Sequence, residues 1–325
     1  MAFRASALLV LLFSPFFVQA APIDIPVAAN DKIILKGLNA QVSYSVQPGS
    51  SSLRVSGLEE AGWKWEKTNG RVYLLGPQAD SRRGLEDQLR TPGKRAVIEI
   101  TGASIASEIH LRDGVVNLNK GAHESTVTLR NGKVVALGRT GSLRAQVMKG
   151  EIFVSDGSGH VDLDLYQGSL TLRNLTQVEG EAYSFGGQLL VDNVKGNLAV
   201  TTSQSTAKVQ KFTGTLVVEN GKGAWTGTAL QGRVEGSSGE GAINLQLIGE
   251  TDVSFKAQSG RVSIQLPKSS GANLNLQTRE GEISVPSEIR VNRTHLEKSV
   301  RGRLRGEAGK FSVMVRSQEG SIVVR

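Results

Sequence analysis

The sequence predicts an all-β fold, a single-stranded parallel β-helix or β-solenoid with coils of roughly 18 residues and two short strands in each coil. Three observations support this prediction. Glycine recurs at a nine-residue step from Gly132 onward, and apolar residues alternate with polar ones after most of these glycines. The chain of 325 residues also contains 38 glycines, no cysteine and only 5% aromatic residues. A constant short period of this kind is typical of stacked structural repeats.

The glycines that keep the nine-residue step lie between residues 132 and 241. After most of them the sequence reads G-x-Φ-x-Φ, where Φ is Val, Leu or Ile, as at Gly150, Gly168 and Gly187. Alternation at period two describes a strand with one buried face, and the preceding glycine marks a positive φ or a close approach of two backbones. A meander of antiparallel hairpins would also alternate, but it would not require so constant a step. Looser copies of the unit return at Gly260, Gly281 and Gly320.

The period also fixes a register. Coils of 18 residues place each side chain beside its equivalent 18 positions away. Arg144 and Asp162 both point outward by alternation. We therefore expect them side by side on adjacent coils, as a surface ion pair contributing roughly 0–1 kcal/mol.

The ends of the chain depart from the repeat. The sequence divides into a signal peptide (1–20), an N-terminal β cap region (21–100), the solenoid repeats (101–285), and a basic connection with C-terminal capping strands (286–325). Alternating stretches in the cap region predict strands near 32–35, 41–46, 52–55, 71–75 and 96–100, with a polar loop at 78–95. The stretches 310–316 and 321–325, joined by Ser-Gln-Glu-Gly, predict a C-terminal hairpin cap that protects the last strand edge.

The first twenty residues have the features of a secretory signal: Arg4, an apolar run over 7–13, and small residues before a cleavage point at Ala21. A retained membrane anchor is the alternative, but the run is short and a Ser-Pro pair interrupts it. No later segment approaches transmembrane length, and no cysteine is present to carry a lipid or a disulfide. We expect export by a Sec-type route to the periplasm, the cell surface or the medium.

Positive charge is local. The whole sequence carries +8, and two basic segments, 81–95 and 286–310, account for the excess of the mature chain. Such clusters attract polyanions such as lipopolysaccharide, teichoic acid or extracellular DNA. No aromatic residues interleave with the second cluster, so sequence-specific recognition of nucleic acid is not supported. The alternative is a solvated loop kept soluble by its charge. The candidate polyanion-binding residues are Arg290, Arg293, Arg301, Arg303 and Arg305.

The sequence offers little for metal or cofactor chemistry. His160, Asp162 and Asp164 occupy alternate positions, but three ligands along one strand spread over roughly 12 Å and cannot converge on one ion. We expect them to face water, with their apolar neighbours facing inward. Calcium β-rolls share the nine-residue step but repeat aspartates in their turns, which this chain does not. We predict no metal and no cofactor.

The strongest competing function is a polysaccharide lyase or hydrolase, because such enzymes also use parallel β-helices. They require a cleft with converging carboxylates or basic residues, usually built by long loops. Corners of about four residues leave little material for a cleft, and Trp63 and Trp65 are expected to pack in the N-terminal cap. We therefore expect no catalysis. A groove lined by two or more converging carboxylates would favour the enzyme.

Several stretches resemble the bacterial putative-adhesin family of β-strand repeats, which is related to the head (GIN-type) domain ascribed to auto-transporter adhesins. They are Val-Gln-Pro-Gly-Ser-Ser-Ser-Leu-Arg-Val, the G-x-Φ-x-Φ series, and the closing Gly-Lys-Phe-Ser-Val-Met-Val and Glu-Gly-Ser-Ile-Val-Val. The resemblance covers roughly residues 31–325. It implies a surface or envelope β-solenoid and supplies no binding residues.

The sequence thus predicts a non-catalytic exported protein, adhesin-like or structural, that presents a rigid β-solenoid surface. The expected partners are cell-surface polysaccharide, another polyanion or an envelope protein. A polysaccharide-acting β-helix enzyme remains the alternative.

Overall fold

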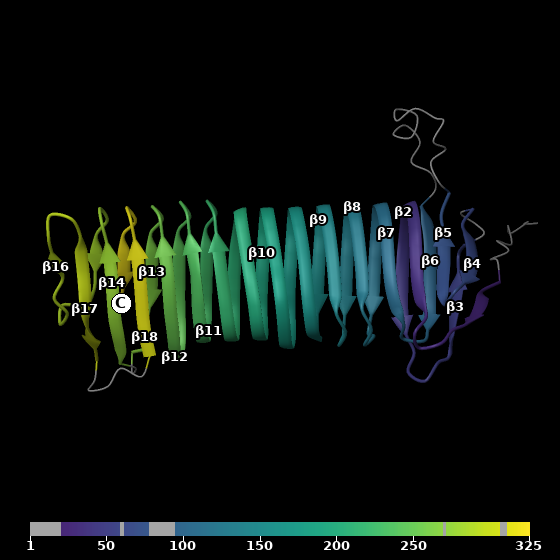
Figure 1. Cartoon of the computed structure of the whole chain (residues 1–325), viewed down its shortest axis with the longest axis horizontal. Coiled ribbons are helices and arrows are strands. Elements are labelled where there is room, and N and C mark those ends of the chain that lie inside the picture. The colour runs from purple at the N-terminus through teal and green to yellow at the C-terminus, as the bar shows by residue number, and fades with distance from the viewer. Residues whose placement is uncertain (1–20, 59–61, 78–94, 269–270, 306–310) are drawn as a thin grey trace, which may run out of the picture.

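The computed structural model describes residues 21–58, 62–77, 95–268, 271–305 and 311–325. These residues form an elongated stack of β-coils without a helix, so the predicted fold class is confirmed (Figure 1). Among them, no helix is long and apolar enough to cross a membrane. The expected signal peptide and most of the basic loop at 78–95 lie outside the described residues.

The strands follow one another along the whole chain. They are β1 (Ile23–Pro26), β2 (Lys32–Val46), β3 (Ser52–Ser56), β4 (Lys64–Thr68), β5 (Arg71–Leu75), β6 (Ala96–Gly102), β7 (Ala106–Asn119), β8 (Ser125–Leu137), β9 (Leu143–Ser155), β10 (Ser158–Asn220), β11 (Trp225–Ser238), β12 (Ile243–Ala257), β13 (Val262–Gln265), β14 (Ala272–Thr278), β15 (Ile283–Ser284), β16 (Asn292–Arg293), β17 (Lys298–Leu304), β18 (Phe311–Ser317) and β19 (Ile322–Val324).

The central coils pair in parallel at the predicted register. β7, β8, β9 and the start of β10 each align residue i with residue i+18, and β10 runs on through several coils. Leu170, for example, lies beside Ile152. Arg144 Nε donates to Asp162 Oδ2 over 2.7 Å, so the predicted pair is confirmed.

Glycine stands at both corners of a coil, and this explains the nine-residue step. A Cβ added to Gly150, whose φ is 145°, would lie 1.8 Å from the carbonyl oxygen of Gly132 in the preceding coil. The corner therefore needs both a positive φ and the absence of a side chain. Half a coil later, a Cβ on Gly159 would meet the Thr140 carbonyl oxygen. One corner column holds Gly114, Gly132, Gly150, Gly168 and Gly187, and the other holds Gly196, Gly214 and Gly232.

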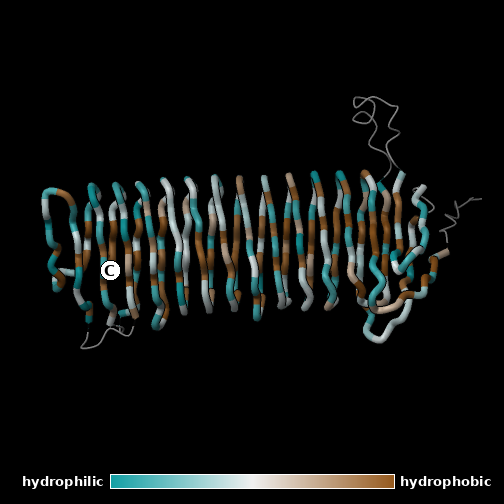
Figure 2. Tube along the Cα trace, viewed as in Figure 1, coloured by the Kyte–Doolittle hydropathy of each residue, from teal (hydrophilic) through white to brown (hydrophobic). Residues whose placement is uncertain are grey.

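Alternation along each strand fills a narrow apolar interior. Figure 2 shows apolar segments of successive coils lying next to one another. Larger side chains such as Phe212, Phe255 and Trp225 are completely enclosed. One interior column turns polar, where Asn220 bonds both Thr202 (2.9 Å) and Ser238 (3.1 Å) across adjacent coils. These buried polar groups are satisfied by each other and by turn carbonyls, which avoids a desolvation cost.

The N-terminal region contributes more than a cap. β2 pairs in parallel with β7, joining residues such as Ala40 and Gly114, and β5 and β6 pair in parallel with the other side of β2. Parallel stacking therefore extends into the expected cap region, back to Lys32. The antiparallel pairs of this region are β1–β3, β3–β6 and β4–β5, so that β1, β3 and β4 cover this end of the stack. Within it Trp63 is buried, whereas Trp65 is 42% exposed and does not pack as expected.

The C-terminal strands lie inside the stack. The expected hairpin of the last two strands does not form, because β18 pairs in parallel with β12 on one side and β14 on the other, and β19 lies between β13 and β15. Figure 1 shows β18 between β12 and β14, with β17 and β16 beyond them. The physical reason is the apolar alternation of β18, which buries Val313 and Val315 in register with Val253 and Phe255 of β12. Antiparallel pairing of β17 with β14 closes this end instead.

Candidate functional site

Two of the five predicted arginines share one outward face. Arg301 and Arg303 lie on β17, where they are exposed and alternate with the buried Val300 and Leu304. They stand opposite Asn275 and Asn273 of β14, so both point away from the interior on the same side of the stack.

The other three arginines do not join them in one cluster. Arg290 is exposed between β15 and β16. Arg293 lies 4.0 Å from Glu282, a carboxylate that also pairs with Lys298. Arg305 follows β17, and its Nη1 donates to the carbonyl oxygen of Pro267 over 3.0 Å. The structure therefore divides the predicted set into an outward pair on β17 and three residues outside that strand.

Two further cations on the same face were missed by the sequence analysis. The register β12–β18–β14–β17 places Arg316 directly beside Lys256. Arg301 lies two strands away from Arg316 and two residues further along the strand direction. Both side chains are exposed. The residues are 60 positions apart in sequence, and only the insertion of β18 brings them together. One signal was available, since Lys-Ala-Gln-Ser-Gly, Arg-Ser-Gln-Glu-Gly and Gln-Thr-Arg-Glu-Gly are copies of one strand-turn unit.

We define the basic face as Lys256 together with the outward side chains of β14, β17 and β18. The three strands contain no Asp or Glu, and their outward positions carry Asn, Gln, Ser, Met and Arg. The nearest carboxylate on β12, Asp252, already accepts bonds from the Ser312 amide (2.8 Å) and hydroxyl (3.1 Å). One carboxylate from outside these strands reaches the face, since Glu297 accepts a hydrogen bond from Gln277 of β14. The strands themselves supply only hydrogen-bonding groups and positive charge at their outward polar positions.

A hollow of about 430 Å³ lies where this face meets the turn after β12 and β18. Lys256 and Arg316 stand in its wall, together with serine and glutamine side chains such as Gln258 and Gln318. Cations beside neutral donors are the groups that bind sulfate, phosphate or carboxylate. The arrangement can hold an anionic group, and its strands fix the position of each cation.

A second hollow, of about 450 Å³, lies over the middle of β10 and is lined by carboxylates. Its wall contains His160, Asp162, Glu179 and Glu181. Asp162 is bound by Arg144, and His160 is exposed as expected. Burial raises the pKa of the neighbouring Asp164, and the charges of Asp162 and Glu181 raise it further. Among the described residues, no group of His, Asp or Glu is arranged to hold a metal ion.

An aromatic pair on β10 was also missed. The rings of Tyr166 and Phe185, at equivalent corner positions of adjacent coils, stack with centroids 4.6 Å apart and an interplanar angle of 3°. Because each ring covers a face of the other, the pair stabilises the corner more than it offers a platform for a ligand.

Comparison with known proteins gives one family and two structures. A family model described as Toastrack DUF4097 matches residues 104–325, more than half of the chain. No curated protein matches. A putative adhesin from Bacteroides fragilis is 12% identical, with a TM-score of 0.35 over 94% of this chain and 96% of that one. A putative cell adhesion protein from Clostridium sporogenes is 13% identical, with a TM-score of 0.19 over 93% and 98%. These two likenesses are too weak to transfer a function.

Proposed function

This chain belongs to the Toastrack DUF4097 family, and we propose that it acts as an exported, non-catalytic, adhesin-like binding protein whose rigid β-solenoid presents a basic face to polyanions. The observation that carries the proposal is the alignment of Lys256, Arg316, Arg301 and Arg303 on one face whose last three strands contain no carboxylate.

The rigidity of the basic face favours binding of a polymer whose anionic groups repeat at regular spacing. Neighbouring strands lie about 4.8 Å apart, so the four cations, which lie on three of four adjacent strands, form a fixed array. A polymer with regularly spaced sulfate, phosphate or carboxylate groups would contact several of them at once, and each contact would release counterions. Sulfated and uronic polysaccharides, lipopolysaccharide and teichoic acid are therefore the expected class of ligand.

Binding to dextran sulfate, measured by calorimetry, tests the proposal, with uncharged dextran as the reference polymer. We expect the quadruple variant Lys256→Ser, Arg301→Ser, Arg303→Ser, Arg316→Ser to bind at least about tenfold more weakly than the natural sequence, with a shallower dependence on salt between 50 and 200 mM. Uncharged dextran should bind to neither protein.

Two controls separate this face from general charge. The variant Arg130→Ser, Lys149→Ser, Lys195→Ser, Lys208→Ser removes the same charge from exposed positions on other coils and should lose little affinity. The variant Arg290→Ser, Arg293→Ser, Arg305→Ser should have an intermediate effect. Equal losses in all three variants would contradict a defined face, because they would indicate that only net charge matters.

One observation favours the alternative of an enzyme acting on polysaccharide. The β10 hollow brings Asp162, Glu179 and Glu181 together, and glycosidases use two carboxylates in different protonation states. Against it, Arg144 already neutralises Asp162. Release of reducing ends from a polysaccharide by the natural protein, lost in Glu181→Gln, would overturn the non-catalytic proposal.

A further inference from the structure

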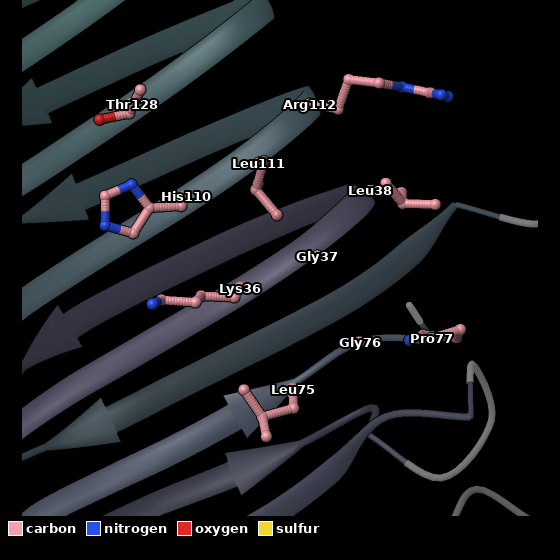
Figure 3. Close-up of a pocket in the computed structure, with 10 residues that line it drawn as sticks. All are labelled: Lys36, Gly37, Leu38, Leu75, Gly76, Pro77, His110, Leu111, Arg112 and Thr128. Carbon is pink, nitrogen blue, oxygen red and sulfur yellow. The ribbon is translucent and has the colours of Figure 1, made fainter. Parts of the chain in front are cut away.

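A hollow of about 360 Å³ lies near the N-terminal end of the stack, away from the basic face and from the β10 hollow. It is lined by Lys36–Leu38 of β2, Leu75–Pro77 at the end of β5, His110–Arg112 of β7, and Thr128 of β8 (Figure 3). Its volume lies within the range of small-molecule pockets, and it has room for about a dozen non-hydrogen atoms.

Two glycines that line the hollow, Gly37 and Gly76, interrupt the interior columns. Gly37 pairs with Leu111, which in turn pairs with Leu129, so β2 lacks the leucine that the next coils place there. The indole of Trp63 occupies this space. A Cβ on Gly37 would lie 2.3 Å from its Cη2, and one on Gly76 would lie 2.7 Å from its Cε2. Glycine backbone, leucine and proline thus form most of the wall, which is apolar.

The polar side of the hollow carries positive charge that is not compensated. Lys36 and His110 are register partners, and in Figure 3 their side chains extend toward the same side, whereas Arg112 extends the opposite way. Glu108 is already bonded by Lys32 and His110, each over 2.7 Å, and Asp113 by Arg112. Within the described part of the chain, Lys36 has no carboxylate partner.

An apolar wall beside one uncompensated cation favours a ligand that has an apolar part and a negative charge. We propose that this hollow binds a single acyl chain with an anionic head group, with the chain against Leu38, Leu75 and Leu111 and the head group on Lys36. His110 and Thr128, the next positions in the same outward row, lie where they can bond the head group. The ligand class, and not its source, follows from this chemistry, since a free fatty acid and a membrane lipid share it.

Calorimetric titration with decanoate tests the proposal, because decanoate has twelve non-hydrogen atoms. We expect saturable binding to the natural protein, and about tenfold weaker binding to Lys36→Met, which removes the charge but keeps the length of the side chain. The matched control Lys208→Met, on β10, should bind as the natural protein does. Decanol should bind the natural protein and Lys36→Met equally, because it lacks the charge.

A second variant tests the cavity itself. Leu38→Trp fills the hollow and should abolish decanoate binding while leaving dextran sulfate binding unchanged, which separates this site from the basic face. Cosedimentation with phosphatidylglycerol vesicles, lost in Leu38→Trp, would identify a membrane lipid as the source, whereas decanoate binding without vesicle binding would identify a free amphiphile. Absence of saturable decanoate binding, or unchanged affinity in Lys36→Met, would overturn the proposal.

Discussion

At the scale of single residues, the corner glycines carry two separate requirements that can be measured apart. Gly150 has a φ of 145° and no room for a side chain, whereas Gly49 has a φ of 80° and nothing within 4 Å of an added Cβ. The first glycine is required by conformation and by contact, the second by conformation alone.

We therefore expect Gly49→Ala to cost about 1 kcal/mol through strain, and Gly150→Ala to cost at least about 3 kcal/mol because strain and a backbone clash add. Guanidinium unfolding followed by circular dichroism measures both. Similar losses in the two variants would mean that the coils separate easily, which close stacking does not allow.

Glu108 makes stability depend on pH in a defined direction. Hydrogen bonds from Lys32 and then His110 lower the pKa of this carboxyl from 4.5 to about 2. Between these values the unfolded chain binds a proton that the folded chain does not, so the contribution is fully present above pH 4.5 and is lost as pH falls through about 2.

We expect Glu108→Gln to reduce the free energy of unfolding at pH 7 by about 1 kcal/mol, since the group is partly exposed and solvent screens the pair. The difference from the natural protein should shrink at pH 2.5 in urea titrations. The control Glu219→Gln, at an exposed position of β10, should change stability by less than about 0.5 kcal/mol at either pH. A difference that grows on acidification would contradict the assignment.

At the scale of elements, the sequence predicted the features that depend on the 18-residue period of the coils. Gly150, Gly168 and the pair Arg144–Asp162 follow from an 18-residue coil, and all three are confirmed. The position of β18 does not follow from the 18-residue period. Any strand with the same alternation of apolar and polar residues fits the stack, so the order of strands in the sequence does not determine their order in space. For the same reason Arg316 and Lys256 escaped prediction, although Arg301 and Arg303, adjacent on one strand, did not.

The insertion of β18 predicts an unusual pattern of amide protection. β18 is paired on both sides although it lies near the C-terminus, whereas β16 has only a two-residue pairing with β17. Hydrogen exchange read by mass spectrometry should show peptides covering 312–316 exchanging more slowly than peptides covering 290–297. Faster exchange in 312–316 would mean that the last strands are peripheral.

At the scale of the whole molecule, charge is distributed unevenly along a rod. Carboxylates line the hollow over β10, whereas the strands at the C-terminal end of the stack are free of them. A rod with separate regions can present different surfaces to different partners, and the N-terminal hollow adds a third. The repeat pattern of the sequence determines the stacked shape of the molecule, and for that reason the shape could be predicted. The ligand depends on which outward side chains meet on adjacent coils, and the repeat pattern does not determine this.

The export predicted from the first twenty residues can be measured on the whole chain. Expression of the full sequence in bacteria should yield a periplasmic or released protein whose first residue is Ala21, identified by mass spectrometry of the intact protein. Recovery of the uncleaved chain with the membrane fraction would favour the retained anchor.

The buried place of β18 and β19 also has a consequence for the order of assembly. Residues 311–324 are synthesised late, yet β13 and β14 each obtain one of their two partner strands from them. Coils nearer the N-terminus can stack while the chain is still emerging, but this last part must wait until its final strands arrive. The protein thus has a completion step, and a nascent chain halted before it would remain open to proteases and to other unfinished chains.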